Sequence, residues 1–248
     1  KEIITVGSPE KMSKSKKNVI DPDTIIQEYG ADTARWFVLS DSPPDRDIFW
    51  SESGVEAAGK FIKKIWKTIL HLNKLSKKKE TNMNTASKNL KERNHKTLSK
   101  ISLDLDNLSF NKVIATLYSF VGDISKIKEE DLINSDVLKE TTYFLIIMLN
   151  PITPHISEEA WKLTQKSKTL VCDEAWPKFD QDLVKESEIV IPIQINGKKR
   201  SEIKVATGLG RDDIESLALE QIEVRAIVKD SKIKKIIVVP DRIINIVI

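Results

Sequence analysis

The feature that most constrains the fold is the helical spacing of apolar residues through the middle of the chain. Between about Ser51 and Phe179, apolar side chains recur every three or four positions, which places them on one face of an α-helix. The stripes comprise Phe61, Ile62, Ile65, Trp66, Ile69, Leu70 and Leu72; Val113, Leu117, Phe120, Val121 and Ile124; Phe144, Leu145, Met148 and Leu149; and Ile156, Ala160, Trp161 and Leu163. Four or five amphipathic helices with short joints predict a helical bundle, which we assign to residues 51–187.

Two stretches interrupt the apolar pattern of this segment. The run from Pro151 to Pro154 ends the third stripe, because proline removes a backbone donor and clashes with the preceding turn. The stretch from Ser76 to Asn94 is polar and rich in lysine, and we predict a mobile connector there.

The last segment, residues 188–248, begins with a strand pattern. Apolar residues alternate with other residues at Ile189, Ile191, Ile193 and Ile195. Asn196-Gly197 then predicts a type I′ turn, and Ile203 and Val205 lie on the return strand.

The rest of this segment mixes a helix with further strands. Asp212 to Val228 reads as helix, and the runs Ile236 to Val239 and Ile243 to Val247 predict a second strand pair around Pro240-Asp241. We therefore predict a small α+β domain over residues 188–248.

The first segment, residues 1–50, opens with Lys1 to Val6, which reads as a strand already under way, without an initiator Met. We therefore expect the chain to be a piece of a longer protein. Further on, Asp21-Pro22 predicts a helix start and Gly30 its end. Asp32 is expected to cap a second helix, from Thr33 to about Leu39.

Composition excludes several classes of protein. The net charge of +3 over 248 residues is too small to identify a nucleic-acid binder by itself. The one cysteine, Cys172, excludes a disulfide within the chain, and the three histidines show no metal-ligand spacing, so we predict no metal site. The chain contains no run of about eighteen apolar residues, so we predict no transmembrane helix.

A lysine-rich loop near the N-terminus carries the chemistry. It reads Lys11-Met12-Ser13-Lys14-Ser15 and continues Lys16-Lys17-Asn18. Four lysines in seven residues, with two hydroxyls and no carboxylate, form a candidate polyanion site. When an amino acid displaces pyrophosphate from ATP, negative charge builds on the departing phosphates, and positioned ammonium groups stabilise that transition state. A solvated basic loop is the alternative reading.

This pentapeptide matches, at all five positions, the Lys-Met-Ser-Lys-Ser signature of the class I aminoacyl-tRNA synthetases, which the chain therefore resembles. The resemblance implies that Lys11, Met12, Ser13, Lys14 and Ser15 form part of the ATP site. Lys14 looks like the principal phosphate contact and Lys11 like a second one, both catalytic, while Ser13 and Ser15 would shape the loop. ATP would carry Mg²⁺ on its phosphates, and no ligand for that ion is identifiable in the chain.

Later segments resemble the leucyl-tRNA synthetases more than the valyl, isoleucyl or methionyl families. They are Tyr29 to Arg35, Ser42 to Asp47 with Trp50-Ser51, Asn150 to Trp161 followed by Trp176-Pro177, Ile193 to Arg200, and Val238 to Val247. The similarity runs in order along nearly the whole chain, except for the lysine-rich stretch from Ser76 to Asn94. It implies the C-terminal part of a bacterial-type enzyme: a mainly α fold in which a helical anticodon-binding-type domain separates the loop from a small α+β domain.

The resemblance also implies a function. Such enzymes make leucyl-adenylate from leucine and ATP and pass the leucyl group to tRNA(Leu), in the cytoplasm and without a membrane. The class's other signature, His-x-Gly-His, is not in this chain. We therefore expect this piece alone not to activate leucine.

Other readings stay open on the sequence. A non-catalytic RNA-binding module would use the pentapeptide as a basic patch, and another class I synthetase would keep the loop with a different amino acid. Lys198, Lys199 and Arg200 lie at or just after the hairpin turn, where tRNA contact and solvated charge are equally open. We expect His155 to be a capping or packing residue, Cys172 to be inert, and the tryptophans to pack in the core.

Overall fold

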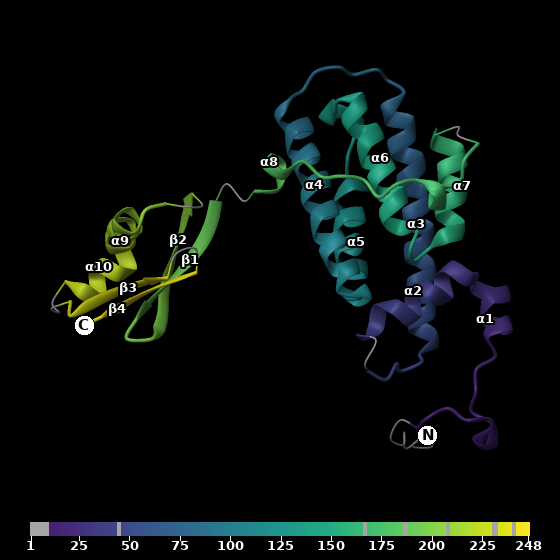
Figure 1. Ribbon diagram of the computed structural model, residues 1–248, viewed down its shortest axis with the longest axis horizontal. Coiled ribbons are helices and arrows are strands. Elements are labelled where there is room, and N and C mark those ends of the chain that lie inside the picture. Colours follow the sequence, from purple (N-terminus) through teal and green to yellow (C-terminus); the bar gives the residue numbers. More distant parts are fainter. Residues whose placement is uncertain are drawn as a thin grey trace, which may run out of the picture. The chain divides into compact units, whose positions relative to one another are not determined.

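The computed structural model describes residues 10–43, 46–165, 168–185, 188–206, 209–229, 233–239 and 242–248. The chain divides into two compact units, Lys1–Val184 and Lys185–Ile248 (Figure 1). The first unit is helical and the second contains a sheet, which confirms the mainly α prediction. The strand expected over Lys1 to Val6 lies outside the described residues. Among the residues that are described, no helix is long and apolar enough to span a bilayer.

Two short helices follow the lysine-rich loop. α1 (Pro22–Tyr29) begins after Asp21, whose side chain accepts the Asp23 N–H at 3.0 Å. It ends at Gly30, whose φ of +86° lies in the left-handed region that glycine adopts without strain. α2 (Ala31–Asp41) starts immediately afterwards. The cap, the proline at the first helical position and the glycine stop are all confirmed.

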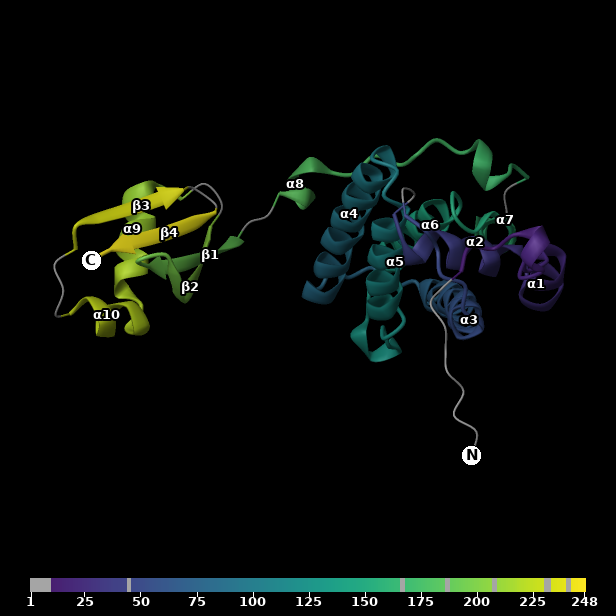
Figure 2. The same cartoon turned by 90° about the horizontal axis from the view of Figure 1, so that it is seen from below.

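Five longer helices form the bundle: α3 (Glu52–Ser76), α4 (Thr85–Asp106), α5 (Phe110–Ile124), α6 (Ser135–Leu149) and α7 (Pro154–Gln165). Figures 1 and 2 show α3, α4, α5 and α6 running side by side. Their apolar stripes meet in one core, where Ile65, Leu98, Leu117 and Leu145 are fully buried. After α7, the described residues form a 3-10 helix, η3 (Val171–Asp173), and a short α-helix, α8 (Gln181–Val184). The predicted bundle is confirmed.

Trp36 attaches α2 to this bundle. Its side chain is fully buried, and its Nε1 donates a hydrogen bond to the Tyr118 hydroxyl at 2.9 Å. Its ring also lies against Phe61, with the centroids 5.1 Å apart. The aromatic body therefore packs in the core while its polar atom stays paired, as a buried tryptophan requires.

Asp32 provides a second attachment, from α2 to α7. Its carboxylate accepts the backbone N–H of Ile156 at 2.7 Å and that of His155 at 3.3 Å. The same carboxylate lies 2.8 Å from Nδ1 of His155. Asp32 is only 7% exposed, so these contacts satisfy a buried charge at the N-terminus of a helix, where backbone donors and the helix dipole favour an anion.

Arg35 lies one turn later on α2 and binds the end of α6. Its Nε donates to the Ile152 carbonyl at 2.8 Å, and a terminal nitrogen donates to the Pro151 carbonyl at 2.9 Å. These carbonyls follow the last residue of α6, where a cation is favoured. We call Asp32 and Arg35, with these contacts, the α2 clamp.

The prediction that Asp32 caps its own helix was wrong. The position before α2 is Gly30, which makes no side-chain cap, and Asp32 already lies in the first turn. Its carboxylate reaches across 123 and 124 residues of sequence to α7. A local capping rule cannot reveal a partner at that separation.

The mobile connector predicted from Ser76 to Asn94 was wrong over most of its length. α4 begins at Thr85, and Asn84 caps it by accepting the Ser87 N–H at 2.8 Å. The inward face of this stretch is made by Ser87, Leu90 and Asn94. Because that face contains one apolar side chain among polar ones, the exposed lysines obscured the helical pattern.

The second unit is a four-stranded sheet with two helices. Its elements are β1 (Glu188–Ile195), β2 (Lys198–Ala206), α9 (Arg211–Glu220), α10 (Ile222–Val228), β3 (Lys235–Val239) and β4 (Ile243–Val247). β1–β2 and β3–β4 are antiparallel pairs, and β1 lies parallel to β4, so the strand order is β2-β1-β4-β3. The predicted α+β organisation is confirmed, and the core is formed by isoleucines of β1 and β4 with apolar residues of both helices.

The turn between β1 and β2 follows the predicted type. Asn196 and Gly197 have φ of +49° and +79°, the positive values that a type I′ turn needs at both central positions. Asn196 also ties the turn to β4, since its N–H donates to the Ile246 carbonyl at 2.9 Å.

The helix expected from Asp212 to Val228 is instead two helices. Gln221 adopts an extended conformation (φ −62°, ψ 135°) between α9 and α10. A continuous helix would place Gln221 and Arg225 on the same face as the buried Ile214. The break places Val224 in the core instead, fully buried.

We expect Asp32→Ala to lower the free energy of unfolding of the first unit by about 1–2 kcal/mol, because α7 loses its cap and buried N–H groups lose their acceptor. Urea unfolding followed by far-UV circular dichroism measures the change. Asp23→Ala, which removes an exposed carboxylate from the first turn of α1, is the matched control and should cost much less. An Asp32→Ala midpoint equal to that of the wild type would contradict the clamp.

Candidate functional site

The lysine-rich loop is held by hydrogen bonds within itself. The Ser13 hydroxyl accepts the Lys16 N–H at 3.3 Å and so caps a short 3-10 helix, η1 (Lys14–Lys16). Asn18 closes the loop, because its Oδ1 accepts the Ser13 N–H at 2.8 Å and its Nδ2 donates to the Lys11 carbonyl at 3.4 Å. The backbone of the pentapeptide is therefore fixed at its first and third residues by one side chain.

The ammonium groups of the pentapeptide are presented to solvent. Lys11 and Lys14 are exposed, and neither forms an ion pair with a residue in the described ranges. Lys16, by contrast, binds Glu10 at 3.0 Å. Met12 is 42% exposed, so it does not bury the loop against the bundle. Lys11 and Lys14 can therefore meet a polyanion without first losing a carboxylate partner.

The hydroxyls of the loop lie together. Ser13 Oγ and Ser15 Oγ are 3.2 Å apart, on the side of the loop that caps η1. The five sequence-predicted residues thus share one continuous loop. Sequence reasoning missed Asn18 and Glu10. The signal for Asn18 was its side-chain amide, which commonly fixes turns; nothing in the sequence marked Glu10 as the partner of Lys16.

The second candidate site is the hairpin of the second unit. Lys198, Lys199 and Arg200 are all exposed. Lys199 binds Glu202 at 2.7 Å, whereas Lys198 and Arg200 have no ion pair within the described part of the chain. The pairing register shifts between Lys199 and Ser201, which makes Arg200 an extra, bulged residue. A bulge interrupts the alternation of side chains along a strand, so consecutive cations can project from one hairpin end.

His155 and Cys172 do not form a catalytic arrangement. The His155 side chain is 72% exposed and contacts the Asp32 carboxylate at the start of α7, as expected of a residue at a helix terminus. Partial desolvation raises the pKa of the Cys172 thiol, and the carboxylates of Asp173 and Glu158 raise that pKa further. A raised pKa keeps the sulfur protonated and weakly nucleophilic, as expected for an inert cysteine.

The tryptophans mostly pack in the core, as predicted. Trp36 and Trp161 are buried, and Trp50 and Trp66 are partly buried against the same core. Trp176 is 37% exposed, but its Nε1 donates to the Ser102 hydroxyl at 2.8 Å, which fixes the segment after α7 on α4.

Two protein-family models match the chain. Residues 87–215 match the anticodon-binding domain of tRNA ligase, which is more than half of the chain. Residues 1–51, which include the lysine-rich loop, match the class I tRNA synthetases (I, L, M and V). The second match favours a synthetase over a non-catalytic RNA-binding module.

The curated relatives are leucine–tRNA ligases. The chain is 43% identical to that of Agrobacterium fabrum and 42% identical to that of Sinorhizobium medicae, in both cases over 100% of this chain and 29% of the relative. It therefore spans less than a third of the relatives' length. In solved structures, it resembles the LeuRS of Agrobacterium radiobacter K84 agnB2 in a ternary complex with tRNA and LeuAMS, with a TM-score of 0.81, 31% identity, and coverage of 96% of this chain and 31% of that one.

Proposed function

This chain belongs to the family of anticodon-binding domains of tRNA ligases, and we propose that it is the C-terminal part of a leucine–tRNA ligase. The observation that carries the proposal is a single resemblance to leucine–tRNA ligases that covers the loop, the bundle and the second unit. The intact protein would charge tRNA(Leu) with leucine, using ATP, in the cytoplasm.

The proposed reaction has two steps. A leucine carboxylate oxygen attacks the α-phosphorus of ATP, forming leucyl-adenylate and releasing pyrophosphate. A hydroxyl of the terminal ribose of tRNA then attacks the leucyl carbonyl carbon and releases AMP. Within this scheme, the present chain supplies the loop for the ATP phosphates and two surfaces for tRNA, and the remainder of the enzyme supplies the leucine pocket.

We assign the phosphate contacts to Lys14 and Lys11. Both ammonium groups are exposed and free of carboxylate partners within the described residues, and the Asn18 and Ser13 hydrogen bonds hold the backbone between them. Charge that develops on pyrophosphate as it leaves would meet these groups, so the interaction strengthens in the transition state. Ser13 and Ser15 shape the loop, and Met12 lies between the two lysines along it.

The Mg²⁺ expected with ATP has no assigned ligand in this chain. Within the ranges that the structure describes, no group of three or more His, Cys, Asp or Glu side chains could hold a metal ion. The lysines are therefore the only charge-neutralising groups that we assign to the phosphates from this chain.

In the intact protein, we expect Lys14→Ala to slow leucyl-adenylate formation by about 10²–10³-fold, because one stabilising charge is lost from the transition state. Stopped-flow measurement of adenylate formation gives the rate, and leucine affinity should change little. Lys162→Ala, which removes an exposed lysine from α7, is the control and should react at the wild-type rate. If Lys14→Ala formed adenylate at the wild-type rate, the proposed phosphate contact of Lys14 would be wrong.

We also propose that the hairpin cations Lys198, Lys199 and Arg200 contact the phosphate backbone of tRNA. Lys198 and Arg200 carry most of this proposal, since Lys199 already has a carboxylate partner at 2.7 Å.

The double variant Lys198→Gln, Arg200→Gln is expected to weaken tRNA binding and to lower the salt dependence of the association constant. The log–log slope should fall by about 0.7–0.9 for each tRNA phosphate that the variant no longer neutralises. Filter binding of tRNA to the chain over a range of KCl concentrations measures both quantities. Lys235→Gln, at the start of β3, is an exposed control in the same unit. A double variant with unchanged affinity and slope would show these cations to be merely solvated.

A further inference from the structure

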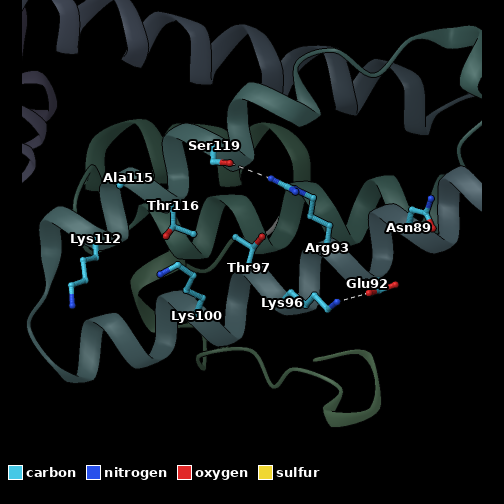
Figure 3. Close-up of a pocket in the computed structure, with 10 residues that line it drawn as sticks. All are labelled: Asn89, Glu92, Arg93, Lys96, Thr97, Lys100, Lys112, Ala115, Thr116 and Ser119. Atoms are coloured by element: carbon cyan, nitrogen blue, oxygen red, sulfur yellow. Dashed lines mark hydrogen bonds and ion pairs between the residues drawn. The ribbon is translucent and has the colours of Figure 1, made fainter. Parts of the chain in front are cut away.

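The helical hairpin of α4 and α5 carries a groove of about 850 Å³ on its outer face. Figure 3 shows α4 and α5 lying side by side, with the labelled side chains of both helices around the groove. The lining residues are Asn89, Glu92, Arg93, Lys96, Thr97, Lys100, Lys112, Ala115, Thr116 and Ser119. The small side chains of Ala115, Thr116 and Ser119 on α5 leave room beside the long ones on α4. The groove thus has two walls of different chemistry.

Positive charge dominates the lining. Arg93, Lys96 and Lys100 come from α4 and Lys112 from α5, against the single carboxylate of Glu92. Lys112 is exposed and has no ion pair in the described portion of the chain. The lining carries four cations and one carboxylate, a formal excess of three. Asp123 and Asp104 pair with Arg93 and Lys100 from outside the lining and reduce the local excess to one.

The three α4 cations have carboxylate partners, and two of these pairs, those of Lys96 and Arg93, are exposed on both sides. Lys96 binds Glu92 at 2.6 Å, Lys100 binds Asp104 at 3.1 Å, and Arg93 pairs with Asp123. Exposed pairs such as those of Lys96 and Arg93 contribute only about 0–1 kcal/mol each. A ligand with several closely spaced negative charges can therefore recruit Arg93 and Lys96, together with the unpaired Lys112, at small cost. Lys100 stays with Asp104, whose carboxylate is buried, and adds its charge to the groove from there.

Hydroxyl donors lie opposite the cations. Ser119 Oγ accepts a hydrogen bond from an Arg93 guanidinium nitrogen at 3.2 Å, as Figure 3 shows. Thr116 is one turn away on the same wall, and Lys100 extends toward it in Figure 3. Guanidinium, ammonium and hydroxyl groups in one groove are the donors that recognise phosphate oxygens.

We propose that this groove binds the phosphodiester backbone of tRNA. The inference rests on the proposed function for the identity of the polyanion and goes beyond it in assigning the surface. From Asn89 to Lys100, the α4 wall extends for about 16 Å at the rise of an α-helix, enough for several phosphates in succession. None of the lining residues is aromatic, so the groove offers no platform for stacking bases. It therefore supplies affinity and orientation, while base identity is read elsewhere.

A second basic surface of the same unit provides the comparison. Lys63, Lys67 and Lys74 form an exposed stripe along α3, with no ion pair to a described residue. The stripe lies on one convex helix, whereas the groove has a second wall with hydroxyls and an arginine. If shape and donor chemistry select the site, the groove and not the stripe holds the backbone, although both carry lysines.

The test compares two triple variants of the whole chain that remove equal charge. One is Arg93→Gln, Lys96→Gln, Lys112→Gln in the groove; the other is Lys63→Gln, Lys67→Gln, Lys74→Gln in the stripe. Fluorescence anisotropy with labelled tRNA at several KCl concentrations gives the Kd and its salt slope. We expect the groove variant to raise the Kd at least tenfold and to lower the slope by about 2–3. The stripe variant should stay within about twofold of the wild type.

Two further measurements keep the result specific to the groove. The charge-conserving variant Arg93→Lys, Lys96→Arg, Lys112→Arg should keep most of the affinity, which attributes the loss in the groove variant to its charge. The groove variant should weaken tRNA(Leu) and a non-cognate tRNA by the same factor, since only backbone is contacted.

Three outcomes of the tRNA-binding test would contradict the groove proposal. Equal losses in the two triple variants would overturn the groove in favour of diffuse attraction. An unchanged groove variant, with wild-type binding intact, would overturn the groove alone and leave the proposed function standing. Failure of the wild-type chain to bind tRNA at any salt concentration would overturn the groove together with the proposed tRNA-binding role.

Discussion

The α2 clamp is the interaction on which the arrangement of the first unit depends. Asp32 binds the start of α7 and Arg35 binds the carbonyls after α6, so one turn of α2 fixes both sides of the α6–α7 connection. Each side chain meets the helix end whose dipole it complements. Since α2 follows the lysine-rich loop by way of α1, the clamp and the buried Trp36 connect that loop to the bundle through two short helices.

The sequence was sufficient for the elements whose signals are local. Apolar spacing predicted α3, α5, α6 and α7, and the Asn196-Gly197 turn predicted the β1–β2 hairpin. The failures needed information from elsewhere in the fold. Asp32 was predicted to cap its own helix, but its carboxylate instead accepts a hydrogen bond from α7. α4 has a polar inward face, and α9 and α10 are separated because Val224, not Gln221, is needed in the core.

The candidate sites also differ in whether their residues are neighbours in the sequence or only in the fold. The pentapeptide is a local motif, so its five residues could be named from the sequence, although the hydrogen bonds of Asn18 that hold it could not. The groove between α4 and α5 depends on two helices, and the first ten residues of α4 fell within the predicted connector, so sequence reasoning could not have assembled it. We therefore propose that the lysine-rich loop binds ATP phosphates. The hairpin cations and the groove would position tRNA, where several weak phosphate contacts add up.

We propose that the intact protein carrying this chain is a leucine–tRNA ligase. The most direct measurement is charging of tRNA(Leu) by that protein with labelled leucine, valine, isoleucine or methionine, each supplied separately with ATP. We predict leucyl-tRNA(Leu) and no appreciable charging with the other three. Efficient charging with another amino acid, or none with leucine, would contradict the claim.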